Sequence, residues 1–431
     1  MLLLRRARVP AALLPPALAG GPLDPLDPAV VCDLRIAGDR ILGVSAPGPA
    51  DPAASGVTVD LQGEMVFPGF VDAHVHLDKA NTWSRAPNRS GSFDEALSNL
   101  AADRANWSAE DLRHRAEFSL RCAWAHGTRV LRTHLDSGLP WGRTSHEVMA
   151  ELRERWRGRI ELQTVPLCPG DEWTGPGGGA LADLAVRNGA VALGGFLVMS
   201  AELPAQIDRL LALARDRRVG IDLHVDENLR PGSEVLRAVA DAVLRTSFPH
   251  AVVCGHCCSL AVQAPERQHS TLELVKAAGI GVLSLPQCNL YLQGRREAGF
   301  PRTPAWRGIT LVHEFLDAGV PVACASDNVR DSFHPYGDFD MSEVLAQSVR
   351  IAQLDLRLAE ASRMVASTAA DLVGLPEYGR IVEGAPAQLV IFPARTFSEL
   401  LSRPMGARRL VDGETVRLSS PPDYAELDTP V

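Results

Sequence analysis

Hydrophobic residues in the middle of the chain form short runs that alternate with longer amphipathic stretches. The runs have the length of buried strands, and the stretches between them repeat apolar residues at helical spacing. We expect strands at Phe67–His76, Arg129–His134, Ile160–Leu167, Val191–Val198, Gly220–His224, Ala251–His256, Gly281–Leu285 and Pro321–Ala325. We expect helices at Glu110–Ala125, Glu147–Arg157, Leu203–Arg217, Glu234–Leu244, Thr271–Ala278 and Ile309–Ala318. This alternation predicts an α/β protein with a (β/α)₈ barrel, the TIM barrel, whose functional side chains gather at the C-terminal ends of the strands.

The two ends of the chain show a different pattern, in which apolar and polar residues alternate singly. Val30–Val44 alternates around a Gly-Asp turn, and Val57–Met65 adds a short strand pair. Gly379–Pro393 and Arg409–Leu418 repeat the hairpin pattern near the other end. We therefore expect a small β-sandwich domain built from both chain ends, with the barrel inserted between them.

These patterns divide the chain into three segments. We expect residues 1–66 to form the N-terminal part of the β-sandwich, 67–372 the barrel, and 373–431 the C-terminal part of the β-sandwich with a tail. An open doubly wound sheet is the alternative fold. It lacks support because no glycine-rich phosphate-binding loop follows the first expected strand.

Composition narrows the classes of partner. The 431 residues are 46% hydrophobic and 22% charged, as in globular proteins, and no apolar run is long enough to span a bilayer. The formal charge of -9 argues against nucleic acid, because phosphate binding needs a basic surface, so a small molecule fits better. The opening Met1–Pro16 is interrupted by prolines and makes a poor signal peptide. Eight cysteines at irregular spacing indicate no disulfide framework, so we expect a cytoplasmic protein.

Two histidines end the first expected strand. Side chains alternate along a strand, so His74 and His76 point into one space, at a spacing suited to a single divalent ion. The alternative is a pair of surface histidines on an edge strand. The apolar neighbours Val71 and Val75 disfavour that alternative.

Polar residues at other strand ends would meet these histidines at one mouth of the barrel. His224 and Asp327 complete a set of three imidazoles and one carboxylate, which suits zinc or iron(II) and leaves a position for water. A hydrogen-bonded core histidine and a helix N-cap are the respective alternatives, and the location at strand ends favours ligands. Glu227 suits a general acid or base beside the metal better than a solvated loop carboxylate. His256 either binds the metal or hydrogen-bonds its water, and the sequence leaves that choice open.

The cysteines and the remaining histidines give weaker evidence of a functional site. Cys254 and Cys257 form a C-x-x-C pair, a spacing found in redox and zinc sites. No second pair accompanies it, and Cys254 falls within an expected buried strand, so we interpret it as an inert core thiol. We interpret the remaining histidines as structural or surface residues, with His134, at the end of the second strand, the first candidate for an exception.

The ordered motifs of the chain resemble those of the amidohydrolase superfamily, and within it the cytosine deaminase-like group. The motifs are PGFVDAHVHLDKA from Pro68, RTHLD from Arg132, IDLHVDEN from Ile221, GHCC from Gly255, NLYLQGR from Asn289, RGIT from Arg307 and CASDNVRDSFHPYGDFDM from Cys324. The resemblance covers nearly the whole chain. It implies a (β/α)₈ barrel with a split β-sandwich domain, one zinc or iron ion, and hydrolytic release of ammonia from an amino-heterocycle. Relatives often form homo-oligomers, although no segment of this sequence marks an interface.

The resemblance also implies a role for each motif residue. The metal ligands correspond to His74, His76, His224 and Asp327. Glu227 corresponds to the proton shuttle, which would protonate the ring nitrogen beside the carbon that carries the amine, and His256 to the residue that orients the hydrolytic water. Asp327 would also take a proton from that water. Ala190–Ser200 contains no lysine, where two-metal relatives that cleave cyclic amides carry a carboxylated one, so we expect a single metal.

The residues that would contact the substrate ring depart from those of cytosine deaminases. Cys168 stands in the loop where those enzymes carry a glutamine, Asn328 replaces an aspartate, and Phe333 replaces a tryptophan. The Ser-Asp-Asn sequence is more similar to relatives that hydrolyse amino-triazines, and an amide both donates and accepts where a carboxylate only accepts. We therefore expect Cys168, Asn328 and Phe333 to bind substrate with a preference different from that of cytosine deaminases.

The sequence thus predicts a metal-dependent aminohydrolase, a hydrolase of carbon–nitrogen bonds other than peptide bonds. Its expected substrate is a free amino-heterocycle, either a cytosine-like pyrimidine or an amino-triazine. One alternative keeps the single metal but cleaves a cyclic amide or removes an N-alkylamino group. A second alternative is a barrel that binds a metabolite without turnover, which would have lost a ligand or the proton shuttle; the sequence retains all of them.

Overall fold

The computed structural model describes residues 1–431 apart from 21, 50–55, 139–140, 296–302 and 429–431. The chain forms two compact units. The first consists of Met1–Asp72, Arg121–Val130 and Phe339–Pro422, and the second of Ala73–Leu120, Leu131–Asp338 and Asp423–Val431. The expected division at residues 66 and 372 follows sequence pattern rather than compactness, and it stays a prediction.

The first unit is built on a mixed eight-stranded sheet drawn from both chain ends. Its strands are β1 (Leu2–Pro10), β2 (Ala29–Ala37), β3 (Arg40–Ser45), β4 (Val57–Asp60), β5 (Met65–Pro68), β14 (Gln388–Phe392), β15 (Arg408–Asp412) and β16 (Thr415–Ser419). Their order is β16-β15-β14-β5-β1-β2-β3, with β4 also paired to β1. The inward side chains of both chain ends share one apolar core, so the additional β domain predicted from the two termini is confirmed.

One prediction at the N-terminus is wrong, and one strand there was not predicted. The opening segment, which makes a poor signal peptide, forms β1, which pairs with β2, β4 and β5. Val57–Met65 does not fold into a strand pair, because β4 and β5 each pair in parallel with β1. Local pattern could not reveal this pairing, since β1 lies far from both strands in the sequence.

The predicted barrel is confirmed. Its strands are β6 (Phe70–Val75), β7 (Thr128–Asp136), β8 (Glu161–Leu167), β9 (Ala192–Leu197), β10 (Gly220–Val225), β11 (Val252–His256), β12 (Gly281–Ser284) and β13 (Val322–Cys324). Strands β9 to β13 form one parallel sheet, and β6, β7 and β8 form a second. Parallel bridges join Val75 to Asp327 and Thr164 to Ala190, which closes the ring. The strands are buried on both faces, which explains their continuous apolar runs.

The expected strand Phe67–His76 is in fact two strands that meet at Gly69. The amide of Gly69 donates to the carbonyl of Gln388 at 2.7 Å, which leaves β5 in the eight-stranded sheet while β6 enters the barrel. A Cβ at this glycine would lie 2.4 Å from Cγ of Arg129. Only glycine fits this crossing, and the uninterrupted apolar run conceals it in the sequence.

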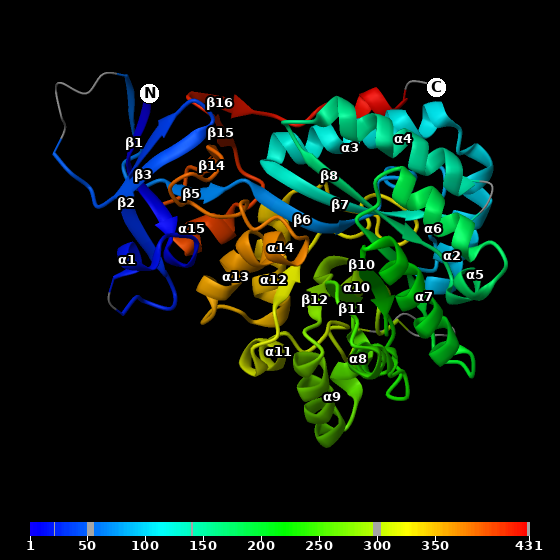
Figure 1. The fold of residues 1–431 in the computed structure, drawn as a ribbon. Coiled ribbons are helices and arrows are strands. Elements are labelled where there is room, and N and C mark those ends of the chain that lie inside the picture. The colour runs from blue at the N-terminus through cyan, green and yellow to red at the C-terminus, as the bar shows by residue number, and fades with distance from the viewer. Residues whose placement is uncertain (21, 50–55, 139–140, 296–302, 429–431) are drawn as a thin grey trace. The chain divides into compact units, whose positions relative to one another are not determined.

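Helices alternate with the barrel strands. They are α2 (Phe93–Asp103), α3 (Ala109–His126), α4 (Trp141–Trp156), α5 (Gly170–Thr174), α6 (Gly178–Arg187), α7 (Leu203–Arg217), α8 (Val235–Thr246), α9 (Pro265–Ala277), α10 (Pro286–Leu292) and α11 (Val312–Ala318). In Figure 1, α7, α8 and α9 follow one another along the outside of the strands. The first unit contains α1 (Pro16–Ala19), α12 (Met341–Ala352), α13 (Leu358–Met364), α14 (Ser367–Leu372) and α15 (Phe397–Ser402). None of the helices in the described part of the chain has the length and apolar character that crossing a membrane requires.

Candidate metal centre and active site

Four side chains from three regions of the barrel meet at the C-terminal ends of its strands, all within the second unit. His74 and His76 come from the end of β6, His224 from β10, and Asp327 from the residues after β13. Nε2 of His224 lies 3.0 Å from Nε2 of His74 and 3.3 Å from Nε2 of His76. Oδ1 of Asp327 lies 3.2 Å from Nε2 of His76 and 3.7 Å from that of His74. The four predicted ligands are therefore brought together.

The spacing of these atoms suits a shared divalent ion. Nitrogen and oxygen ligands bonded to one zinc ion at about 2.0–2.2 Å lie no more than about 4.4 Å from one another. The four observed separations, 3.0, 3.2, 3.3 and 3.7 Å, are within that limit. Both carboxylate oxygens of Asp327 are buried, and among the described residues neither has a donor with hydrogen-bond geometry. The donor set of three nitrogens and one carboxylate suits zinc or iron(II).

Burial favours the neutral form, which a metal needs, for two of the three imidazoles. Burial lowers the pKa of His74 and of His224 well below the ordinary value, so both rings are neutral. Nδ1 of His76 lies 3.3 Å from the carbonyl oxygen of His134, and a hydrogen bond donated there leaves the lone pair on Nε2. Orientation of a ligating histidine by a backbone carbonyl is a regular feature of metal sites.

Glu227 and His256 stand beside this cluster. Nδ1 of His256 lies 3.4 Å from Oε1 of Glu227 and 3.0 Å from Nδ2 of Asn289. Burial, reinforced by the charge of Asp327, raises the pKa of Glu227 well above its ordinary value, which favours the protonated form of this side chain. Burial lowers the pKa of His256 to about 4, which keeps that ring neutral. A protonated acid beside a neutral histidine suits proton transfer to a substrate.

The backbone at these strand ends adopts an unusual conformation. Asp226 (φ 54°), His256 (φ 70°), Cys257 (φ 52°) and Asp327 (φ 62°) all have positive φ without being glycine. These residues follow or end β10, β11 and β13, three strands that supply the site. Left-handed backbone at non-glycine residues is costly and concentrates at functional sites, where it directs side chains into place.

His134 joins the cluster, as the exception anticipated among the remaining histidines. Its ring stacks on that of His74, with centroids 4.0 Å apart and planes at 31°. Its Nε2 lies 3.7 Å from Oδ1 of Asp222, a buried carboxylate that Arg132 holds at 2.8 Å. Cys254 is fully buried, and burial raises its pKa well above the ordinary value, in agreement with an inert thiol. All eight cysteines are buried.

The site opens into a pocket with about 520 Å³ of space not filled by atoms, part of it open to solvent. Its lining includes His76, Lys79, Phe93, Leu97, Leu100, Arg104, Asp136, Leu167, Phe196, His224, Glu227, His256, Asp327, Asn328 and Phe333. Of the three expected substrate contacts, Asn328 and Phe333 line this pocket. Cys168 does not; it is 2% exposed, and its neighbour Leu167 lines the pocket in its place.

Comparisons with known proteins show the family to which the chain belongs. The sequence matches the amidohydrolase family over residues 57–118 and 110–404. A pterin deaminase of Rhizobium rhizogenes (strain K84 / ATCC BAA-868) is 46% identical over 398 residues, which cover 92% of this chain and 90% of the relative. The chain belongs to the amidohydrolase family. The comparisons also confirm the predicted class of reaction, hydrolytic deamination of an amino-heterocycle by a metal-dependent hydrolase of carbon–nitrogen bonds other than peptide bonds.

Solved structures show the same fold. 5-Methylcytosine deaminase of Klebsiella pneumoniae, liganded with 5-fluorocytosine, has a TM-score of 0.81 at 24% identity, over 98% of each chain. N-isopropylammelide isopropylaminohydrolase of Burkholderia multivorans ATCC 17616 has a TM-score of 0.73 at 25% identity, over 96% of this chain and 97% of that one. The barrel and its additional β domain are therefore shared across these proteins.

The helix that lines one side of the amidohydrolase pocket was not predicted from the sequence. Helix α2 was not expected, although Ser92 caps its start by accepting a hydrogen bond from the amide of Glu95 at 3.1 Å. Its residues Phe93, Leu97 and Leu100 line the pocket from one helical face. The serine-to-glutamate spacing of a capping box, followed by apolar residues at helical spacing, was the available signal.

Asn328, which lines the pocket, is held in place by the neighbouring acidic residue Asp331. Its Nδ2 donates to Oδ2 of Asp331 at 2.6 Å, while Oδ1 of Asp331 accepts from the backbone amides of Phe333 and His334. Burial raises the pKa of Asp331 to about 6. The network orients the Asn328 amide at the pocket wall and fixes the backbone that carries Phe333.

We expect Asn328→Asp to destabilise the amidohydrolase in a pH-dependent way. Two buried carboxylates would face each other without a donor between them, which should lower the free energy of unfolding by about 3 kcal/mol at pH 8. Like charge raises the pKa of the pair further, so the loss should shrink as the pH falls below 6 and one carboxylate binds a proton. Denaturant unfolding of variant and wild type at pH 8 and pH 5 measures this difference. An equal loss at both pH values would contradict the like-charge explanation.

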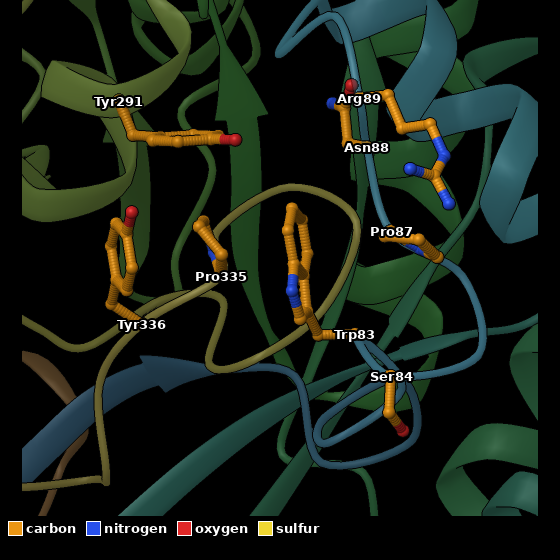
Figure 2. Close-up of a pocket in the computed structure, with 8 residues that line it drawn as sticks. All are labelled: Trp83, Ser84, Pro87, Asn88, Arg89, Tyr291, Pro335 and Tyr336. Atoms are coloured by element: carbon orange, nitrogen blue, oxygen red, sulfur yellow. The ribbon is translucent and has the colours of Figure 1, made fainter.

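A second pocket lies outside the metal cluster. Figure 2 shows its lining, which is Trp83, Ser84, Pro87, Asn88, Arg89, Tyr291, Pro335 and Tyr336. The rings of Tyr291 and Tyr336 stand nearly perpendicular, with centroids 6.3 Å apart and planes at 88°. It contains none of the candidate catalytic residues, so the chemistry belongs to the first pocket.

Proposed function

We propose that this amidohydrolase is a mononuclear-metal deaminase of the 2-amino-4-oxopteridine (pterin) ring, which it converts to the corresponding 2-oxo ring with release of ammonia. The observation that carries the proposal is the meeting of three imidazoles, a carboxylate and Glu227 at the C-terminal ends of the barrel strands, in a chain 46% identical to a pterin deaminase over 92% of its length. The substrates expected from the sequence, a pyrimidine or a triazine, contain a single ring. The proposal moves to a bicyclic ring because the triazine-hydrolysing relative is only 25% identical.

We further propose that His74, His76, His224 and Asp327 hold one zinc or iron(II) ion. A divalent ion bound there supplies Lewis-acid activation of water. Asp327, which faces His74 and His76, accepts a proton from the attacking water. Glu227 holds the other mobile proton and donates it to the ring nitrogen beside the carbon that bears the amine. His256 orients the water, and its 3.4 Å separation from Glu227 lets it steady that carboxyl group as well.

The reaction relocates two protons, which explains why the site contains two carboxyl groups. Water loses one proton on attack, and the departing amine gains one to leave as ammonia. Burial and the charge of Asp327 raise the pKa of Glu227, so the two groups begin in different protonation states. Two titratable groups with pKa values pushed apart are typical of an acid and base pair.

A substrate panel tests the proposed function. Zinc- and iron-loaded protein would be assayed with pterin, cytosine, an amino-triazine and an N-isopropylamino-triazine, with ammonia and isopropylamine measured separately. We expect kcat/KM for pterin to exceed that of every other compound by at least about tenfold, near the 10⁴ M⁻¹s⁻¹ common for good substrates. Faster release of ammonia from cytosine or the triazine would contradict the proposal, and release of isopropylamine would favour the N-alkylamino alternative. The cytoplasmic location and a homo-oligomeric state remain proposals beside it.

A further inference from the structure

Lys79 is an unusual residue in this chain. Of the 43 Lys and Arg residues only two are lysines, Lys79 and Lys276, so the chain otherwise relies on arginine for positive charge. Lys276 is exposed on α9, whereas Lys79 is 4% exposed and lines the pocket that contains the candidate catalytic residues. A compact ammonium thus stands at the pocket wall, beside the planar guanidinium of Arg104.

The ammonium of Lys79 is fixed from two sides. Its Nζ donates to Oδ1 of Asp136 at 2.9 Å and lies 5.4 Å from the centroid of the Phe333 ring. Arg104 donates to the other oxygen of Asp136 at 2.7 Å, and the backbone amide of Asp136 donates to Asp78 at 2.6 Å. Asp136, which anchors Lys79, is therefore itself held by hydrogen bonds to its side chain and from its backbone amide.

This arrangement leaves donors of Lys79 available to a ligand. An ammonium carries three N–H donors, and within the described part of the chain Asp136 is the single hydrogen-bond partner of Nζ. Burial of a charged group with unused donors is expensive, and it is retained where a ligand completes the set. Lys79 lines the same pocket as Glu227 and Asp327, so a ring that reacts there presents its other edge within the reach of this wall.

We propose that Lys79 donates a hydrogen bond to the exocyclic 4-oxo group of the substrate ring and thereby selects amino-oxo rings over rings without an acceptor at that position. The proposal rests on the proposed deamination at C2, which the ring nitrogen N3 separates from the 4-oxo carbon. Lys79 is in this account a specificity-determining residue. Asp136, Arg104 and Phe333 are positioning residues that hold its ammonium against the pocket.

The test compares Lys79→Met with wild type on two rings. Pterin carries the 4-oxo group, and 2-aminopteridine lacks it, so kcat/KM is measured for pterin and the inhibition constant is measured for 2-aminopteridine. Loss of a charge-assisted hydrogen bond should lower kcat/KM for pterin about 100-fold, while the inhibition constant of 2-aminopteridine should change by less than about threefold. Lys276→Met, the other lysine of the chain, is the matched control and should leave both values unchanged.

Other results would overturn either the role of Lys79 or the proposed function. Pterin turnover within about threefold of wild type in Lys79→Met, or a parallel loss of affinity for 2-aminopteridine, would overturn the role of Lys79 while leaving the proposed function intact. A wild-type protein that deaminates no 4-oxo ring would overturn the proposed function itself. If Lys79→Met does not fold, Lys79→Gln, which keeps an uncharged donor, replaces it in the test. This variant should lower kcat/KM for pterin by a smaller factor and leave the inhibition constant of 2-aminopteridine within about threefold of wild type.

Discussion

Glu227→Gln should abolish turnover, with kcat at least about 10³-fold below wild type, while metal content stays at the wild-type level. A carboxamide has nearly the same shape as a protonated carboxyl group but cannot release a proton and recapture it. Burial and the charge of Asp327 raise the pKa of Glu227, which favours the acid form of the wild-type group. Steady-state assays of ammonia release, together with metal analysis of the same samples, measure both parts of this expectation.

A matched substitution separates this effect from general damage. Glu234→Gln changes a residue at the start of α8 that pairs with Arg267 and is not among the residues lining the pocket, and it should keep wild-type kcat. Turnover of Glu227→Gln within tenfold of wild type would remove Glu227 from the mechanism. Loss of metal in that variant would instead make Glu227 a ligand, contrary to its expected place beside the metal.

His224→Ala should lose both the metal and the activity. Nε2 of His224 lies 3.0 and 3.3 Å from the Nε2 atoms of His74 and His76, so its removal takes one corner from the donor set. Substitutions of groups that merely orient ligands reduce metal affinity by 10- to 100-fold, and loss of a ligand itself should exceed about 100-fold. Metal content after dialysis and kcat with pterin are the measurements.

The exposed His269 provides the control for this variant. It lies on α9 with a side chain that is 76% exposed, and His269→Ala should keep the wild-type values for metal and turnover. Full metal occupancy in His224→Ala would contradict the ligand assignment, whatever happened to activity.

The sequence was most informative where a residue's function and its local pattern coincide. Helix α7 begins and ends at the residues predicted, because its apolar periodicity is complete. His74, His76, His224 and Asp327 could be selected because strand alternation and the chemistry of strand ends point to the same residues. A barrel brings all its strand ends to one rim, so residues distant in sequence could be expected to meet there.

The sequence was least informative where the structure depends on long-range pairing. The break at Gly69 lies inside a continuous apolar run, and only the crossing beside Arg129 explains it. The contact of Lys79 with Asp136 joins two motifs that were noted separately and for other reasons. Hydrogen bonds between side chains of segments distant in sequence have no local periodicity, so neither alternation nor helical spacing could predict them.

The central claim is that one divalent ion binds where β6, β10 and the end of β13 meet. Anomalous diffraction from crystals of the purified protein, measured at the zinc and iron absorption edges, tests that claim directly. The account predicts a single strong anomalous peak bonded to His74, His76, His224 and Asp327. A peak elsewhere in the molecule with these four side chains unligated, or metal-free crystals of fully active enzyme, would contradict it.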